Sequence, residues 1–182
     1  MTTQPAHHEQ TIEVIFSPEA IAARLEELAL EIKAAAIEPL LVVPVLKGSF
    51  VFAADLIRAM HRAGMEPEVD FLTLSSYKKS RVSSGMVEIL RDLDLTVEAR
   101  NVLLVDDVLD SGRTLVFAKD LIAARGAKSV RTCVLLDKKV PRAVNVAADF
   151  RAFDCEDTFV VGYGMDVAHR YRELPYVGRV SG

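Results

Sequence analysis

Residues 102–115 read VLLVDDVLDSGRTL, and this stretch decides the fold of the chain. Four apolar residues run into two adjacent aspartates, which are followed by a third aspartate and Ser-Gly-Arg-Thr. A short run of branched apolar residues is typical of a strand buried in a parallel sheet. Small residues just before an amphipathic segment, here 114–126, are typical of the start of a helix. The stretch therefore predicts a buried strand that leads directly into a helix.

The same order of strand and helix recurs along most of the chain. The expected strands are 11–16, 40–46, 69–77, 86–93, 102–107 and 129–137, and the expected helices are 18 to about 36, 49–64 and 114–126. This alternation predicts an α/β fold, with a parallel twisted sheet flanked by helices on both faces. We expect residues 1–10 to be a disordered tail and 11–182 to be one domain. A small hood is expected largely from 140–182, in which 149–153 and 159–164 are strand-like, together with the N-terminal strand.

Length, charge and cysteine content narrow the functional classes. The chain has 182 residues, of which 51% are hydrophobic and 26% charged, as is typical of one globular domain. A net charge of -4 does not favour a nucleic-acid partner, because binding to phosphate backbones usually needs a basic face. Cys133 and Cys155 match no disulfide or zinc pattern, and neither a signal peptide nor a membrane-spanning run is recognisable. These features favour a cytoplasmic protein without membrane or nucleic-acid partners.

The polar residues of the opening stretch form a pattern suited to a phosphorylated sugar. Ligands of open parallel sheets lie beyond the carboxyl ends of the strands, where loops lead into helix N-termini. Backbone N–H groups of Ser111–Thr114 would favour a phosphate at such a place. Asp106 and Asp107 could accept hydrogen bonds from two vicinal hydroxyls or hold Mg²⁺, and Asp110 could act as an acid or base. The alternative is an acidic surface turn that only caps a helix.

The stretch also resembles the motif with which phosphoribosyltransferases bind 5-phosphoribosyl 1-pyrophosphate (PRPP), and Asp110 resembles the mark of their purine-salvage branch. Nearly the whole chain after the tail is similar, block by block, to the hypoxanthine (hypoxanthine-guanine) phosphoribosyltransferases of the type I family. The resemblance implies a parallel core of five strands with a hood, dependence on Mg²⁺, and conversion of hypoxanthine or guanine plus PRPP into IMP or GMP plus pyrophosphate. The residues that it assigns are Asp106, Asp107, Ser111, Gly112, Arg113 and Thr114 for PRPP, Asp110 for catalysis, and Asp106, Asp107 and Asp166 for the metal.

Two further loops match the family, one at the pyrophosphate end of the substrate and one as a lid over the reaction centre. Lys47 and Gly48 follow a buried strand, a position that suits either a phosphate-binding loop or an exposed turn. The resemblance assigns them to pyrophosphate together with Arg172, and it implies that the Lys47–Gly48 peptide can be cis. The polar segment 75–85 suits either a mobile lid or a plain hairpin loop. Its Ser76-Tyr77 pair resembles the closing loop of the family.

The remaining matches concern the purine base. Taken alone, Lys138 is expected to be a solvated surface lysine, and Phe159 in an apolar run is expected to be a core aromatic. The resemblance instead implies that Lys138 binds the exocyclic oxygen of the purine and that Phe159 stacks on its ring. It also implies a backbone contact from Val160 and a place for Asp166 near the base and a second metal. Because an ammonium only donates, Lys138 would select 6-oxopurines over adenine.

Three positions depart from the family pattern, and other functions remain open. Arg113 stands where many relatives have lysine, Val167 where an aromatic residue is frequent, and His169 where an acid is frequent. An RNA-binding regulator of pyrimidine genes with the same fold would have tyrosine in place of Asp110. Orotate-using enzymes also lack this aspartate, whereas use of xanthine depends on contacts of the hood. The expected partners are PRPP and a 6-oxopurine, and the expected assembly is a homodimer or homotetramer.

Overall fold

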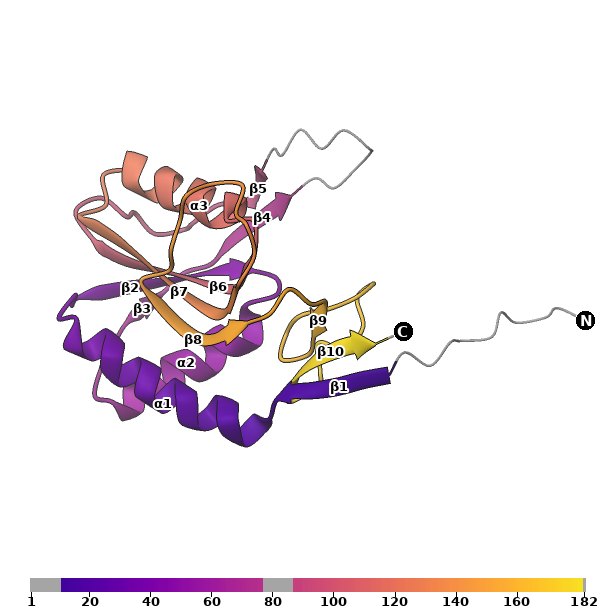
Figure 1. Cartoon of the computed structure of the whole chain (residues 1–182). Helices are drawn as coiled ribbons and strands as arrows, with labels where there is room; N and C mark the ends of the chain where they lie inside the picture. The colour runs from indigo at the N-terminus through magenta and orange to yellow at the C-terminus, as the bar shows by residue number, and fades with distance from the viewer. Residues whose placement is uncertain (1–10, 77–86, 182) are drawn as a thin grey trace, which may run out of the picture.

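The computed structural model describes residues 11–76 and 87–181, which form a large sheet, a small sheet and three helices (Figure 1). The strands are β1 Thr11–Phe16, β2 Leu40–Leu46, β3 Glu68–Val69, β4 Leu72–Ser76, β5 Val87–Arg91, β6 Asn101–Leu109, β7 Ser129–Lys138, β8 Phe150–Cys155, β9 Val160–Val161 and β10 Val177–Ser181. The helices are α1 Pro18–Ala34, α2 Phe50–Arg62 and α3 Arg113–Ala124. This alternation confirms the predicted α/β fold. The expected tail lies outside the described residues.

Five strands of the large sheet run parallel to one another, in the order β4-β2-β6-β7-β8, with β8 at one edge. β3 pairs in parallel with β2, and β5 pairs with β4 as the antiparallel strand of a hairpin. Six consecutive residues of β2, from Leu40 to Val45, are buried. Such uninterrupted apolar runs are needed where helices cover both faces of a sheet. The parallel core of five strands that the resemblance implied is thus confirmed.

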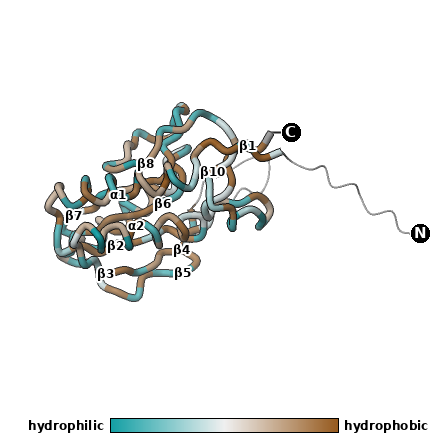
Figure 2. The backbone as a smooth tube through the Cα atoms, turned by 90° about the horizontal axis from the view of Figure 1, so that it is seen from below, coloured by the Kyte–Doolittle hydropathy of each residue, from teal (hydrophilic) through white to brown (hydrophobic). Residues whose placement is uncertain are grey.

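Helices α1 and α2 cover one face of the large sheet, and α3 covers the other (Figure 1). Neighbouring residues of β6 show the reason. Leu103 packs in the cluster that includes α1 and α2, whereas Leu104 packs in the cluster that includes Ile122 of α3. Successive side chains of a strand point to opposite faces, so one apolar run supplies both cores. In Figure 2 the central strands are accordingly coloured mostly as hydrophobic.

Strands β1, β9 and β10 form the small antiparallel sheet, which lies beside the large one (Figure 1). The expected hood segment, 140–182, is divided between the two sheets, because β8 extends the large sheet next to β7. β8 lies there because its apolar side chains reach the core: Ala152 is buried, and Phe153 stacks on Phe16 with ring centroids 4.2 Å apart. The small sheet therefore takes only β9 and β10 from this segment.

Two observations concern membrane-spanning helices and the state of the cysteines. In the described part of the chain, no helix is both long and apolar enough to cross a membrane. Cys133 and Cys155 are both buried and free. Burial raises the pKa of the Cys133 thiol, which leaves it protonated and unreactive at neutral pH.

Candidate active site

The carboxyl ends of three neighbouring strands bring the predicted site residues to one edge of the large sheet. β2 ends just before Lys47, β6 ends just before Asp110, and β7 ends at Lys138. β6 lies between β2 and β7, and both pairings are parallel, so all three ends point the same way. This is the edge at which open α/β sheets bind their ligands.

Asp106 and Asp107 lie inside β6, near its carboxyl end. Asp106 is buried, with 7% of its surface exposed, and Asp107 is partly buried. The Asp107 N–H donates to Asp106 Oδ1 at 3.0 Å, and the Val108 N–H donates to Asp107 Oδ1 at 2.9 Å. Burial, followed by the neighbouring Asp107 charge, raises the pKa of Asp106 well above its usual range, and burial also raises the pKa of Asp107. The pair is therefore suited to a cation or to hydroxyl donors.

Gly48 lies against the carboxylate of Asp107. A Cβ atom on Gly48 would lie 1.8 Å from Asp107 Oδ2, so only glycine fits at this position. The resemblance implied a cis peptide between Lys47 and Gly48, and this prediction is wrong by one residue. The non-proline cis bond of the structure joins Leu46 to Lys47. The bond after Lys47 belongs to the turn into α2, in which the Lys47 carbonyl accepts a hydrogen bond from the Phe50 N–H at 3.2 Å. This turn places Gly48 against Asp107, and the exposed Lys47 directly precedes Gly48.

The loop before α3 has the geometry predicted for a phosphate site. Gly112 is the N-cap residue and has a left-handed φ of 80°. The first N–H groups of a helix have no intrahelical partner, and no described side chain caps this helix. A Cβ atom on Gly112 would lie 2.5 Å from Val146 Cγ1, and the Ala143 N–H donates to the Ser111 carbonyl at 3.2 Å. Residues 143–146 thus contact the loop at Gly112 and at the Ser111 carbonyl. The N–H groups at the start of α3 remain available to an anion.

Lys138 lies beside Asp110 at the ends of β7 and β6. Its Nζ is 3.5 Å from Asp110 Oδ2, and Lys138 is buried whereas Asp110 is exposed. Arg142 holds the chain after Lys138 by pairing with Asp137 and by donating to the Val146 carbonyl at 2.7 Å. Lys138 is therefore not the solvated surface lysine of the alternative interpretation. The pair places an ammonium donor next to a carboxylate, which suits a heterocycle with a carbonyl oxygen beside a ring nitrogen.

The segment after β9 brings two more charged residues toward this edge. Arg172 pairs with Asp166 at 2.7 Å and donates to the Gly164 carbonyl at 2.6 Å. A Cβ atom on Gly164 would lie 2.5 Å from the Gly48 carbonyl oxygen, so the two backbones are in direct contact. Burial dominates the pKa of Asp107, but the Arg172 guanidinium acts to lower it. Arg172 therefore lies within electrostatic reach of the paired aspartates.

The predicted purine-stacking residue is available to a ligand. Phe159 is 55% exposed, whereas the neighbouring Val160 is buried in β9. Phe159 is therefore not the core aromatic of the alternative interpretation.

The His169 N–H donates to Asp166 Oδ2 at 2.7 Å. Because this contact uses the backbone, the unusual side chain at position 169 does not remove it.

The metal and lid predictions are not tested by the contacts of the described side chains. Asp166, which the resemblance places near a second metal, pairs with Arg172. Within 11–76 and 87–181, no three His, Cys, Asp or Glu side chains gather closely enough to hold a metal by themselves. The lid prediction cannot be compared, since Tyr77 and the side chain of Ser76 lie outside the described residues.

Sequence reasoning missed the contacts of Arg142 and of Tyr163, whose hydroxyl donates to Asp55 Oδ2 at 2.6 Å. Arg142 makes the contacts that hold the chain after Lys138. No local pattern distinguishes it from an ordinary loop arginine. Tyr163 lies between Gly162 and Gly164, and its signal was a side chain flanked by two residues that favour positive φ.

Comparisons with known proteins agree with this geometry. Residues 12–168 match the model of the phosphoribosyl transferase domain. The hypoxanthine phosphoribosyltransferase of Buchnera aphidicola is 43% identical over 173 residues, which cover 93% of this chain and 96% of the relative. The hypoxanthine-guanine phosphoribosyltransferase of Bacillus subtilis is 44% identical over 166 residues, which cover 91% of each chain.

Solved structures show the same likeness. The hypoxanthine-guanine phosphoribosyltransferase of Bacillus anthracis, solved with a HEPES molecule in its active site, has a TM-score of 0.86 and 39% identity, over 95% of this chain and 100% of that chain. The hypoxanthine phosphoribosyltransferase of Staphylococcus aureus has a TM-score of 0.87 and 33% identity, over 100% of this chain and 97% of that one. The chain belongs to the phosphoribosyltransferase family. Within it, the chain is an enzyme of the hypoxanthine phosphoribosyltransferase branch with the type I fold, as the sequence predicted.

Proposed function

We propose that this enzyme transfers the 5-phosphoribosyl group from PRPP to hypoxanthine, and also to guanine, in purine salvage. The products are IMP or GMP and pyrophosphate. The proposal rests on one observation: the Asp106–Asp107 pair, the start of α3 and the Lys138–Asp110 pair meet at one edge of the sheet. They are suited to a ribose diol, a phosphate and a purine, which are the parts that the reaction joins.

On the sugar side, the N–H groups at the start of α3 bind the 5′-phosphate, with the Ser111 and Thr114 hydroxyls and Arg113 around it. Arg113 keeps the positive charge of the lysine found in many relatives but offers a planar set of donors. Asp106 and Asp107 accept hydrogen bonds from the two ribose hydroxyls. Gly48 lies directly against the Asp107 carboxylate. This contact supports the assignment, because it places the pyrophosphate loop of Lys47 and Gly48 beside the sugar that Asp107 binds.

On the pyrophosphate side, the loop of Lys47 and Gly48 and the guanidinium of Arg172 bind the leaving group. The close approach of Gly164, whose carbonyl binds Arg172, to the Gly48 carbonyl supports a shared ligand. The bond between the ribose carbon and pyrophosphate breaks as positive charge grows on that carbon. The two cationic side chains then stabilise the negative charge that collects on the departing pyrophosphate.

On the purine side, Phe159 stacks on the ring, the Val160 backbone binds its edge and Asp166 lies near the base. Lys138 donates to the exocyclic oxygen, and a purine nitrogen attacks the ribose carbon. Asp110 accepts the proton that the purine loses at N7, which lies next to the exocyclic oxygen. The 3.5 Å separation of Lys138 and Asp110 supports this arrangement, because an acceptor oxygen next to an N–H donor on the purine needs an adjacent donor and acceptor in the protein.

We infer that the cofactor is Mg²⁺, held at Asp106 and Asp107 with a second ion near Asp166. The described residues fit this ion, because the two adjacent carboxylates have pKa values raised by burial and would gain from a cation. Mg²⁺ is usually held by one or two carboxylates together with substrate phosphates and water, so a three-carboxylate cluster is not required. Bound Mg²⁺ would neutralise charge on the pyrophosphate oxygens.

Three further assignments belong to the same proposal. Ser76 and Tyr77 act as a lid that keeps water from the reacting sugar. The enzyme works as a homodimer or homotetramer, a proposal that rests on the family resemblance. A relative from Trypanosoma cruzi, 34% identical, has been solved in a study of how its C-terminal region affects oligomeric state and activity. A cytoplasmic location is supported by the two free, buried cysteines.

One assay separates this function from its rivals. The purified enzyme is incubated with PRPP and Mg²⁺ and with hypoxanthine, guanine, xanthine, adenine, uracil or orotate in turn, and pyrophosphate is measured. We expect release with hypoxanthine and guanine and almost none with adenine or orotate. Release with xanthine or orotate alone would overturn the proposed substrate class. Salt-sensitive retention of RNA without any base-dependent release would indicate the regulatory binding module instead.

A further inference from the structure

The turn between β9 and the segment of Arg172 has an unusual backbone. Its three successive residues are left-handed, with φ of 90° at Gly162, 50° at Tyr163 and 99° at Gly164. Positive φ is uncommon for a bulky residue such as tyrosine. The Tyr163 N–H donates to the Leu174 carbonyl at 2.8 Å, and the Gly164 N–H donates to the Arg172 carbonyl at 3.0 Å. The turn and the returning chain therefore form one hydrogen-bonded unit.

Both glycines of this turn lie at close contacts with other backbone groups. A Cβ atom on Gly162 would lie 2.2 Å from the Tyr176 carbonyl oxygen. A Cβ atom on Gly164 would lie 2.5 Å from the Gly48 carbonyl oxygen. Tyr163 is thus the only residue of the turn whose side chain can reach another element.

The Tyr163 side chain reaches α2. Tyr163 is 6% exposed, and its hydroxyl donates to Asp55 Oδ2 at 2.6 Å. The other oxygen of Asp55 accepts a hydrogen bond from Arg58 Nη1 at 3.0 Å. Burial, followed by the hydrogen bond to Asp55, raises the pKa of Tyr163, so the phenol remains a neutral donor.

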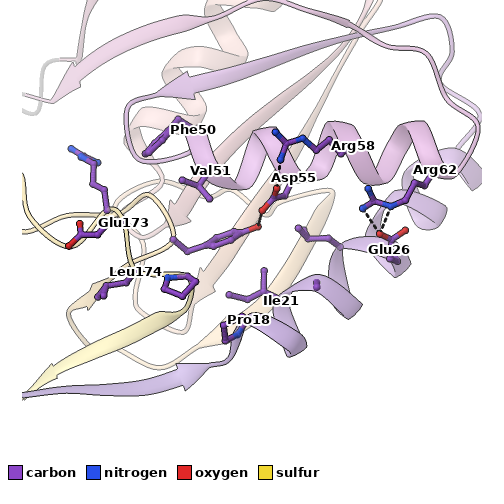
Figure 3. Close-up of a pocket in the computed structure, with 15 residues that line it drawn as sticks. Pro18, Ile21, Glu26, Phe50, Val51, Asp55, Arg58, Arg62, Glu173 and Leu174 are labelled. Atoms are coloured by element: carbon purple, nitrogen blue, oxygen red, sulfur yellow. Dashed lines mark hydrogen bonds and ion pairs between the residues drawn. The ribbon is translucent and has the colours of Figure 1, made fainter.

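These residues line a cavity of about 880 Å³ between α1, α2 and the chain around Leu174. In Figure 3, Asp55 and Arg58 lie on the α2 wall of this cavity, and Ile21 lies on the opposite wall. The link between Tyr163 and Asp55 crosses from the turn to α2 beside this empty space. Tyr163 also packs in the core cluster that includes Ile21 of α1 and Phe52 of α2, so the hydrogen bond to Asp55 adds a directional contact to this apolar packing.

Two specific contacts join this turn to the segment of Gly48 and α2, in addition to apolar packing against α2. The first is the backbone contact of Gly164 with Gly48, and the second is the hydrogen bond of Tyr163 to Asp55. Asp55 lies on the helix that directly follows Gly48 in the chain. Apolar packing is not directional, whereas two specific contacts at different points define the orientation of the turn. Arg172 is hydrogen-bonded to this turn, so its position depends on both.

We propose that Tyr163 and Asp55 form a positioning pair, which holds Arg172 and Gly48 at the spacing that the pyrophosphate group of PRPP requires. The inference rests on the pyrophosphate-binding role proposed above for Arg172 and Gly48. Neither member of the pair touches the substrate, and both act through the backbone of the turn. A purely structural hydrogen bond would affect stability but would not distinguish between the two substrates.

The test compares Tyr163→Phe and Asp55→Asn with the unchanged enzyme. Tyr163→Phe removes only the hydroxyl, and Asp55→Asn keeps the shape of the acceptor but removes its charge. We expect KM for PRPP, and KM for pyrophosphate in the reverse reaction, to rise about tenfold in each variant. KM for hypoxanthine should change less than about twofold. Arg58→Gln is the matched control, because it removes the other partner of Asp55, and it should behave like the unchanged enzyme.

The outcomes separate this inference from the assignment beneath it. An unchanged KM for PRPP in Arg172→Gln would remove the pyrophosphate-binding role itself. A raised KM in Arg172→Gln but not in Tyr163→Phe or Asp55→Asn would overturn only the positioning pair. An equal rise in KM for both substrates, or a lower melting temperature with unchanged kinetics, would also overturn it. Should Tyr163→Phe fail to fold, Asp55→Asn still provides the measurement.

Discussion

The ammonium of Lys138 and the carboxylate of Asp110 lie 3.5 Å apart, although the first side chain is buried and the second exposed. Lys138 ends β7, and Asp110 follows β6, the strand with which β7 pairs in parallel. A buried ammonium is costly unless it is paired, so Asp110 supplies a charge that Lys138 needs while no substrate is bound. The two groups that we assign to one edge of the purine are thus already adjacent.

Asp110→Asn should reduce kcat by about 10² to 10⁴, because a positioned general base commonly contributes a factor of that size. PRPP binding should persist, since the phosphate loop and the paired aspartates are unchanged. Steady-state kinetics and PRPP binding measured by calorimetry check the two parts. Asp120→Asn, an exposed carboxylate on α3, is the matched control. Turnover close to normal in Asp110→Asn would exclude Asp110 from proton transfer.

Lys138→Gln should lower kcat/KM for hypoxanthine by roughly 10 to 100-fold, which corresponds to one charged hydrogen bond. Glutamine can both donate and accept, so discrimination against adenine should weaken at the same time. Pyrophosphate release with each base measures both effects. Lys139→Gln changes the next residue, whose side chain is exposed and pairs with Glu156 at 3.7 Å, and it should have no effect. Equal losses in the two variants would contradict the predicted role of Lys138.

Gly48→Ala should reduce kcat/KM for PRPP by about 10²-fold, because the new Cβ would displace the Asp107 carboxylate. Kinetics with varied PRPP test this expectation. Gly126→Ala is a control for general destabilisation: Gly126 has a φ of 83°, but its Cβ would approach nothing closer than Glu98 Cγ at 3.5 Å. Both variants should lower the melting temperature, and only Gly48→Ala should impair PRPP use. Normal kinetics in Gly48→Ala would show that Asp107 tolerates displacement.

Asp149→Ala should destabilise the enzyme by about 1–3 kcal/mol at pH 7, because it leaves the N–H and hydroxyl of the buried Thr132 without their acceptor. Burial acts to raise the pKa of Asp149, but hydrogen bonds from Arg131 and Thr132 outweigh it and hold the pKa below its usual range. A lowered carboxylate pKa adds stability above the unfolded value of about 3.9. That stability is lost as the pH falls through the folded pKa.

The difference in unfolding free energy between Asp149→Ala and the unchanged enzyme should therefore shrink as the pH is lowered from about 5 toward 2. Urea unfolding at several pH values gives the measurement. Asp154→Ala, a change at an exposed residue of β8, is the control and should show little dependence on pH. A difference for Asp149→Ala that stays constant over this range would mean that its charge is not involved.

Much of the fold could be predicted from the sequence because its signals are local. Ser17 and Pro18 predict the start of α1, and the structure shows the Ser17 side chain accepting a hydrogen bond from the Ala20 N–H at 3.3 Å. The apolar run 40–46 coincides with β2. β8 was recognised as strand-like, but its place in the large sheet was not, because a six-residue strand does not indicate which edge it will join.

The candidate site was predictable only in part. Asp106, Asp107 and Asp110 belong to one continuous motif, so their proximity follows from the chain itself. Two other contacts depend on which strands are neighbours. One is the burial of Lys138 beside Asp110, and the other is the contact of Gly164 with Gly48. The pairing of Asp166 with Arg172 likewise depends on how the chain after β9 returns to this edge, which no local pattern indicates.

By itself, the sequence determined the order of strands and helices, the glycine-led start of α3 and the cluster of acids before it, since each depends on residues that are close along the chain. Only the tertiary structure decided that Tyr163 binds Asp55, 108 residues away, and that β8 completes the large sheet. The physical reason is that such contacts depend on the order and register of the strands, which are set by packing over the whole core rather than by any local segment.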